Sequence, residues 1–158
     1  MSKSPLALIA ALSVLALLPC FASGEDLVGP TSREAILEHC PDWLGLTASY
    51  QPKPAALDKL RALGREVRVE VFFGSWCSDS IAHVPAFFKV LDLVDLPFIR
   101  AEYFGVPEAK EKRAEYYQGR DVVKLPTFIV FVDGREAGRI VETPQSSVEE
   151  DLVRILGL

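Results

Sequence analysis

The stretch that most constrains the fold is residues 74–80, GSWCSDS, because the spacing of apolar side chains changes there. From position 67 to position 73, valine or phenylalanine recurs at every second residue, which is typical of a β-strand. From Cys77 to Leu91, apolar residues recur at steps of three and four, which is typical of a helix. Cys77 is therefore predicted to lie where a strand passes into a helix. There the free N–H groups and the positive end of the helix dipole stabilise a thiolate.

Ser80 stands three residues after Cys77, so this motif holds a single thiol. The Ser80 hydroxyl is expected either to donate a hydrogen bond to a Cys77 thiolate or to belong to an ordinary first-turn residue. Asp79 is favoured by the helix dipole, but its charge beside Cys77 opposes thiolate formation. The motif favours a reactive cysteine over one that only packs.

The beginning of the chain has the pattern of an export signal. Lys3 lies near the start, residues 6–18 are apolar, and small residues follow at positions 22–24. We expect cleavage and a periplasmic, cell-envelope or secreted location. The apolar run is short for a membrane span, which makes an uncleaved anchor the weaker alternative. A lipid anchor at Cys20 is disfavoured because a proline precedes it in place of a small residue.

Charge and composition exclude several kinds of partner. The signal removes only Lys3 of the 17 basic residues, so 16 stand against 22 acidic ones, a net charge of −6, with no basic block. A nucleic-acid partner therefore has no electrostatic support. His39 and His83 have no companions at metal-ligand spacing, so no metal site is expected. We expect no cofactor, no membrane contact after cleavage, and a monomer.

Residues 25–64 are predicted to form two helices that pack on the rest of the chain. The first begins at a capping box and ends at a proline, and the second begins at a proline and ends at a glycine. An apolar Trp43-Leu44 pair and a stretch without convincing period lie between them. The first helix begins at Thr31 with Glu34 and ends at Pro41, the connection covers residues 45–53, and the second helix begins at Pro54 and ends at Gly64.

The chain beyond the motif helix alternates between strands and helices. Pro85 lies inside the motif helix and is expected to kink it. Asp133-Gly134 is a strong hairpin signal between two runs of strand-forming residues. The predicted elements are strand 96–103, an exposed helix 107–117, strand 128–132, strand 136–141, and a last helix capped by Ser146 with Glu149.

Residues 67–156 resemble the thioredoxin family in the order of their elements. That order is strand, Trp-Cys-x-x-Ser, a helix with a proline eight residues after the cysteine, strand, helix, Leu-Pro-Thr, hairpin and terminal helix. Several elements agree in register, which is far more specific than Cys-x-x-Ser alone. The resemblance implies an α/β fold with a central mixed β-sheet flanked by helices. Residues 65–158 would form this domain, 25–64 an N-terminal helical extension, and 1–24 the signal peptide.

The resemblance also implies the composition of the site. Cys77 would be the catalytic thiol, and Pro126 would be cis and lie against it, since only X-Pro bonds become cis at modest cost. The expected site residues are Cys77 and Ser80 for catalysis, and Trp76, Leu125, Pro126 and Thr127 for substrate binding.

Two positions depart from the family pattern. Family reductases have a second cysteine where this chain has Ser80. They often have a buried carboxylate six residues before the first cysteine, where this chain has Val71. Both parts of the step that expels substrate are therefore missing together.

Three functions remain open for this chain. The first is a monothiol thiol-disulfide oxidoreductase, in which Cys77 forms mixed disulfides with protein or small-molecule substrates and an external thiol releases them. The second is a redox-inactive module that binds extended peptides or acts as a holdase. The third is a structural disulfide between Cys77 and Cys40. The sequence favours the first.

Cys40 is the candidate second thiol. Its apolar neighbours Ile36 and Leu37 favour a small hydrophobic role for Cys40 at an interface away from Cys77. If its helix packed beside the motif instead, Cys40 would be able to act as a resolving thiol.

Overall fold

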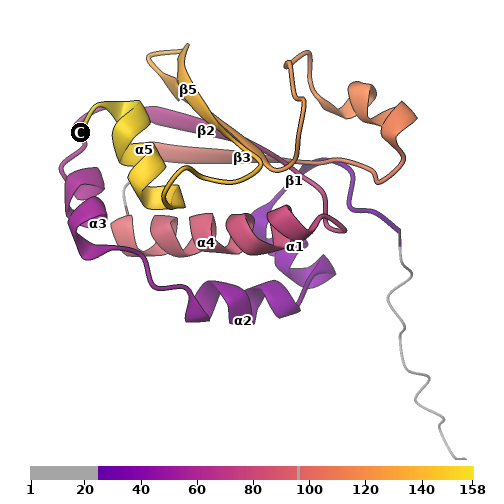
Figure 1. Ribbon diagram of the computed structural model, residues 1–158, viewed down its shortest axis with the longest axis horizontal. Coiled ribbons are helices and arrows are strands. Elements are labelled where there is room, and N and C mark those ends of the chain that lie inside the picture. Colours follow the sequence, from indigo (N-terminus) through magenta and orange to yellow (C-terminus); the bar gives the residue numbers. More distant parts are fainter. Residues whose placement is uncertain (1–24, 96) are drawn as a thin grey trace, which may run out of the picture.

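The computed structural model describes residues 25–95 and 97–158, which form a mixed β-sheet with helices (Figure 1). The strand order is β1-β3-β2-β4-β5. Strands β2 and β3 are parallel, and the other neighbouring pairs are antiparallel. The strands are β1 (Gly29–Thr31), β2 (Val67–Phe73), β3 (Ile99–Gly105), β4 (Thr127–Val132) and β5 (Arg135–Val141).

The helices gather on one face of this sheet (Figure 1). They are α1 (Arg33–His39), α2 (Asp42–Ser49), α3 (Pro54–Arg61), α4 (Ser78–Val94) and α5 (Val148–Leu156). A short 3-10 helix, η1 (Lys110–Tyr116), lies apart from them, in the orange segment of Figure 1. No helix in the described part of the chain is long and apolar enough to cross a membrane.

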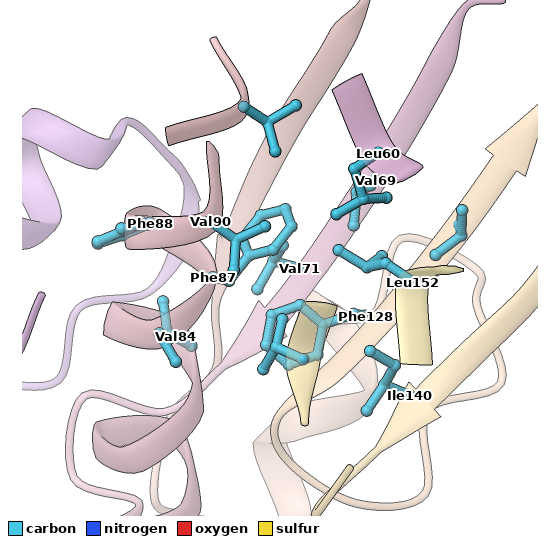
Figure 2. Packing of buried hydrophobic residues seen from close by; sticks show 14 of the residues in the cluster. Leu60, Val69, Val71, Val84, Phe87, Phe88, Val90, Phe128, Ile140 and Leu152 are labelled. Carbon is cyan, nitrogen blue, oxygen red and sulfur yellow. The ribbon is translucent and has the colours of Figure 1, made fainter. Parts of the chain in front are cut away.

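The main hydrophobic cluster fills the space between the sheet and its helices. Alternate residues of β2 point into it, and Phe87 of α4 meets Phe128 of β4 edge to face, with ring centroids 5.3 Å apart (Figure 2). Ile36, Trp43 and Leu57 bring α1, α2 and α3 into the same cluster. The N-terminal helices therefore share the core of the sheet.

A smaller cluster covers part of the opposite face. It contains Phe72 of β2, Ile129 and Phe131 of β4, and Val122 and Leu125 from the segment before β4. Successive residues of a strand point to opposite faces, which is why Phe72 and Phe73 belong to different clusters.

Both predicted helix caps are displaced by one residue. Thr31 lies in β1, paired with Tyr103, and Ser32 is the cap of α1, its Oγ accepting a hydrogen bond from the Ala35 N–H at 3.2 Å. Ser147, rather than Ser146, caps α5. In each case the hydroxyl residue directly after the predicted one is the cap, because its side chain accepts the hydrogen bond from the first turn.

Two other predictions in the helical segments were wrong, and a third was right in its exposure but not in its helix type. The connection expected at 45–53 begins inside α2, whose Trp43 and Thr47 face inward while Leu44 and Leu46 are exposed, so its apolar period is weak. Helix α3 ends at Arg61, three residues before Gly64. The exposed helix expected at 107–117 is the 3-10 helix η1, in which no residue is buried.

Candidate functional site

Cys77 lies at the N-cap of α4, directly after the loop that follows β2. Its φ and ψ angles are −86° and 124°, and its N–H donates to the Gly74 carbonyl at 3.1 Å. The thiol is half-buried against the smaller cluster. The predicted position at the junction of strand and helix is therefore confirmed.

The Cys77 thiol meets the segment before β4. Its Sγ lies 3.6 Å from the Leu125 carbonyl oxygen, a distance at which the thiol donates a hydrogen bond. The Leu125–Pro126 peptide bond is cis. The fold thus brings Cys77 together with the Leu125-Pro126-Thr127 segment, 48 residues further along the chain.

Three successive carbonyls fix the shape of this segment. The Lys124 carbonyl accepts a hydrogen bond from the Thr127 hydroxyl at 2.7 Å, and the Leu125 carbonyl accepts one from Cys77. The Pro126 carbonyl accepts one from the Glu142 N–H at 2.7 Å. Thr127 is fully buried, so it supports the segment rather than meeting solvent.

Ser80 braces the motif from inside. Its side chain is fully buried, and its Oγ accepts a hydrogen bond from the Gly74 N–H at 3.2 Å. Within residues 25–95 and 97–158, Cys77 Sγ hydrogen-bonds to Leu125 and not to Ser80. This contact fits the role of an ordinary first-turn residue, and donation from Ser80 to a Cys77 thiolate stays a prediction.

Trp76 is folded back over the motif and held there. Its indole N–H donates to the Val106 carbonyl at 2.9 Å, and the Arg113 guanidinium lies 4.6 Å from its ring centroid. A Cβ at Gly74 would stand 2.6 Å from the indole, so the ring requires glycine there. Arg113 also donates to the Pro107 and Glu108 carbonyls. These partners had no signal in the sequence around the motif.

A strap formed by residues 25–28 also presses on the motif. The Leu27 N–H donates to Ser75 Oγ at 3.4 Å, and Asp26 accepts a hydrogen bond from the Glu108 N–H at 2.7 Å. The Leu27 carbonyl packs so closely on Gly105 that a Cβ there would lie 2.0 Å from its oxygen. Residues 25–28, 106–113 and 124–127 thus all contact the motif.

A thiol at the start of a helix, facing a cis-proline segment from a neighbouring strand, defines this site. A family model described as thioredoxin matches residues 34–153. The chain belongs to the thioredoxin family. Helices α1, α2 and α3 lie almost entirely within the matched residues, together with the motif and the Leu125–Pro126 bond.

Solved structures agree with this family fold. A Pseudomonas aeruginosa protein of unknown function is 19% identical, with a TM-score of 0.58, over 83% of this chain and 91% of that one. An HIV epitope-scaffold is also 19% identical, with a TM-score of 0.56, over 83% of this chain and 84% of that one. No curated protein matches the chain significantly. At this identity the two structures support the fold alone.

In this thioredoxin-family chain, a buried glutamate, Glu70, directly precedes Val71, the position at which the family carboxylate is missing. Its side chain lies on the other face of β2 from that of Val71. Val71 is fully buried in the main cluster, whereas Glu70 lies against Arg120 and Arg68. Burial would raise the pKa of Glu70, but hydrogen bonds from both guanidinium groups outweigh it and lower that pKa. Its oxygens are already occupied, so Glu70 is a structural carboxylate.

The two described cysteines are free thiols and lie in different surroundings. Cys40 follows α1 and packs against the main cluster, while Cys77 packs against the smaller one. Burial, followed by the charge of Asp42, raises the pKa of the Cys40 thiol. The structural disulfide between them is therefore not formed, and the interface position predicted for Cys40 fits its packing.

The two histidines lie apart from each other. His39 is in the last turn of α1, and His83 is on α4. Burial lowers the pKa of His83, and the charge of Asp79 opposes this effect. Among the described residues, no three His, Cys, Asp or Glu side chains are arranged to hold a metal ion.

Proposed function

We propose that this thioredoxin-family protein catalyses thiol-disulfide exchange through Cys77 alone. The observation that carries the proposal is the Cys77 thiol, exposed in part at the N-terminus of α4 and 3.6 Å from the carbonyl that precedes the cis bond. A 17-residue helix directs its free N–H groups at this end of the molecule. The thiolate is the nucleophile of such reactions.

The exchange runs in two steps that balance without a cofactor. The Cys77 thiolate attacks one sulfur of a disulfide R–S–S–R′, forms a Cys77–S–S–R bond, and releases R′ as a thiolate that takes up a proton. An external thiol then attacks the mixed disulfide, bonds to R, and releases the Cys77 thiolate. The net result is an exchange: R′ leaves as a thiol, R ends in a disulfide with the external thiol, and Cys77 is unchanged.

The dependence on an external thiol rests on Ser80 and Cys40. Ser80 has no sulfur and is buried, hydrogen-bonded to Gly74. Cys40 packs on the other side of the sheet from the cluster that Cys77 contacts. Neither supplies an internal thiol next to the mixed disulfide.

A peptide-binding role without turnover is the second candidate. Two apolar side chains near Cys77 are exposed, Ile81 by 36% and Val123 by 74%. Val123 lies two residues before Leu125, so an extended peptide docked along this segment would cover it. Such binding does not require a reactive thiol.

Turnover of hydroxyethyl disulfide with glutathione as the external thiol separates the two candidates. Cys77→Ser is expected to abolish turnover, and Cys40→Ser, the matched control, to keep the wild-type rate. A Cys77→Ser protein that turned over at the wild-type rate would refute the proposal. If the wild type has no turnover but binds an unfolded peptide as tightly as Cys77→Ser does, the binding role stands instead.

We also propose that the protein is exported. Residues 1–24, including Cys20, lie outside the described residues, so the support comes from the sequence pattern alone. Mass spectrometry of the protein from a cell-envelope fraction is expected to find a mature chain that starts near Glu25. An intact N-terminus would favour the uncleaved anchor.

A further inference from the structure

A cleft of about 250 Å³ opens on α4, further along the helix from Cys77. One wall is α4, which contributes Ala82 and His83. The other wall is the connection from β5 to α5, which contributes Thr143, Pro144, Ser146 and Ser147, together with Val148 at the start of α5. The cleft has no part in the exchange chemistry described above.

The two elements that line the cleft also reach the Cys77 site. Cys77 caps the helix on which His83 lies six residues later, a rise of about 9 Å along the axis. On the other side, Glu142 donates its N–H to the Pro126 carbonyl at 2.7 Å, and Thr143 follows it directly into the cleft. A chain that is bonded to Cys77 and runs between these walls therefore reaches the cleft.

The wall formed by the β5–α5 connection is held in place before any ligand arrives. Glu142 has a φ of +62°, a left-handed conformation that costs a residue other than glycine about 1–2 kcal/mol. Its backbone is tied to Pro126, and its carboxylate pairs with the Lys124 ammonium. Strain of this kind persists where the surrounding contacts impose it, and it is common at binding sites.

The far end of the cleft is equally fixed. The Tyr50 hydroxyl donates to Glu149 at 2.9 Å, and the Lys53 N–H donates to the same carboxylate at 3.0 Å. Glu150 pairs with the Lys53 ammonium at 2.7 Å. Glu149 and Glu150, the carboxylates at this end of the cleft, are thus already bonded to Tyr50 and Lys53.

The lining suits an uncharged aromatic group with a polar tip. Ala82 and Pro144 present hydrocarbon, while His83 presents an imidazole and Ser146 and Ser147 contribute hydroxyl groups. Because burial lowers the pKa of His83 despite Asp79, the ring is neutral at pH 7 and offers one donor and one acceptor. An apolar cavity of about 150 Å³ is enough to hold benzene, so this cleft has room for a phenol ring.

We propose that this cleft is a specificity subsite that takes a tyrosine side chain of a polypeptide disulfide while that polypeptide is bonded to Cys77. The tyrosine ring packs between α4 and the β5–α5 connection, and its hydroxyl hydrogen-bonds to His83. The inference rests on the proposed exchange at Cys77 and adds to it a substrate preference.

Rates of mixed-disulfide formation test the subsite. The probes are short peptides whose single cysteine is disulfide-bonded to mercaptoethanol, with tyrosine or alanine at each position near that cysteine, and hydroxyethyl disulfide serves as the small reference. Tyrosine at one position is expected to raise the rate about three- to tenfold, the range of one hydrogen bond. The reference rate is expected to be the same in every variant.

The variants separate recognition from folding. Ala82→Phe fills the cleft from an exposed position and is expected to remove the tyrosine preference without changing the reference rate. His83→Ala is expected to do the same, His83→Asn to restore part of the preference, and His39→Ala to have no effect. Two results would overturn the subsite. One is a tyrosine preference that is unchanged in Ala82→Phe, and the other is a rate of mixed-disulfide formation that is the same for tyrosine and alanine at every position.

Different results would refute the subsite and the proposed exchange. If no disulfide reacts with Cys77, the exchange function is wrong, and the subsite is then decided by titrating the tyrosine peptide into the protein. A shift of the His83 imidazole NMR signals, with His39 unchanged, would support it. An unchanged His83 would refute it.

Discussion

The face of the sheet that carries α3, α4 and α5 buries one continuous hydrocarbon cluster, whereas the opposite face divides into two parts. Near the motif, that second face has Phe72 stacked on Phe104, with centroids 4.9 Å apart. Further along β2 it has Glu70 between Arg68 and Arg120, with both guanidinium groups over Phe131. The first face is stabilised by one large hydrophobic cluster, and the second by a smaller cluster together with the ion pairs of Glu70.

This difference explains where the site lies. A continuous apolar cluster leaves little freedom to change one residue without a loss of packing. On the second face, Cys77 and Trp76 lie only partly buried at the edge of the smaller cluster. The helix-covered face thus supplies rigidity, and the second face supplies access to the thiol.

The largest expected effect comes from the helix-covered face. Phe87→Ala removes a fully buried ring that meets Phe128, and it should lower the free energy of unfolding by about 3–5 kcal/mol. Urea denaturation followed by circular dichroism measures the loss. Val123→Ala, at an exposed position, is the control and should change stability little. Equal effects of the two variants would contradict the assigned core.

Loss of the charged contact on the second face should have a smaller effect. Glu70→Gln leaves two guanidinium groups without their carboxylate and should lower the free energy of unfolding at pH 7 by about 1–3 kcal/mol. The pKa of Glu70 is lowered in the folded state, so its contribution is complete above the unfolded pKa and is lost as pH falls through the folded one.

Denaturation at several pH values checks this sign. The stability difference between wild type and Glu70→Gln should be largest near pH 7 and should shrink in strong acid. A difference that stays constant from neutral pH to pH 2 would show that the charge of Glu70 is not its cause. Glu136→Gln, on the exposed surface of β5, offers a control in which the difference should be smaller at every pH.

A Ser80 variant tests the hydrogen bond that holds the motif loop to α4. Ser80→Ala removes the acceptor of the Gly74 N–H and should lower the free energy of unfolding by about 1 kcal/mol. Because the motif loop loses a brace, the alkylation rate of Cys77 should also change, whereas that of Cys40 should not. An unchanged Cys77 rate would mean that Gly74 is held sufficiently by its other contacts.

The smallest expected effect is a gain. Gly45 lies inside α2, and a Cβ there would meet no atom within 4 Å. Gly45→Ala should raise the free energy of unfolding by about 0.5–1 kcal/mol because glycine weakens a helix interior. The matched change Gly105→Ala should instead destabilise, since its Cβ would collide with the Leu27 carbonyl. Thermal unfolding of both variants gives opposite signs if the strap packs as described.

The sequence was informative wherever the signal was local. The alternation before residue 74, the helical spacing after Cys77, and the hairpin at Asp133-Gly134, where both φ angles are positive, each depend on neighbours a few residues apart. Pro85 was also correctly assigned to the interior of α4. These signals gave the order of strands and helices from β2 to α5, whereas α2 was missed.

Contacts between distant segments had no such signal. Strand β1 has only three residues, too few for a period, and it exists because it pairs with β3. Trp76 bonds to Val106, 30 residues away, and Glu70 to Arg120, 50 residues away. A polar residue in a buried segment indicates that a hydrogen-bond partner is needed, but only the three-dimensional fold shows which residue that partner is. The roles of Ser80 and Glu70 therefore became clear only in three dimensions.

The strap has a practical consequence for labelling the molecule. Leu27 touches the motif at Ser75, so a tag or dye attached just ahead of Glu25 would begin within a few residues of the reactive thiol. The last residue, Leu158, lies near α3, where Lys59 bonds to its carbonyl, and Figure 1 shows the C-terminus at the opposite end of the molecule from β1 and α1. A carboxy-terminal label would leave the thiol accessible, and an amino-terminal fluorophore would report on whatever binds beside it.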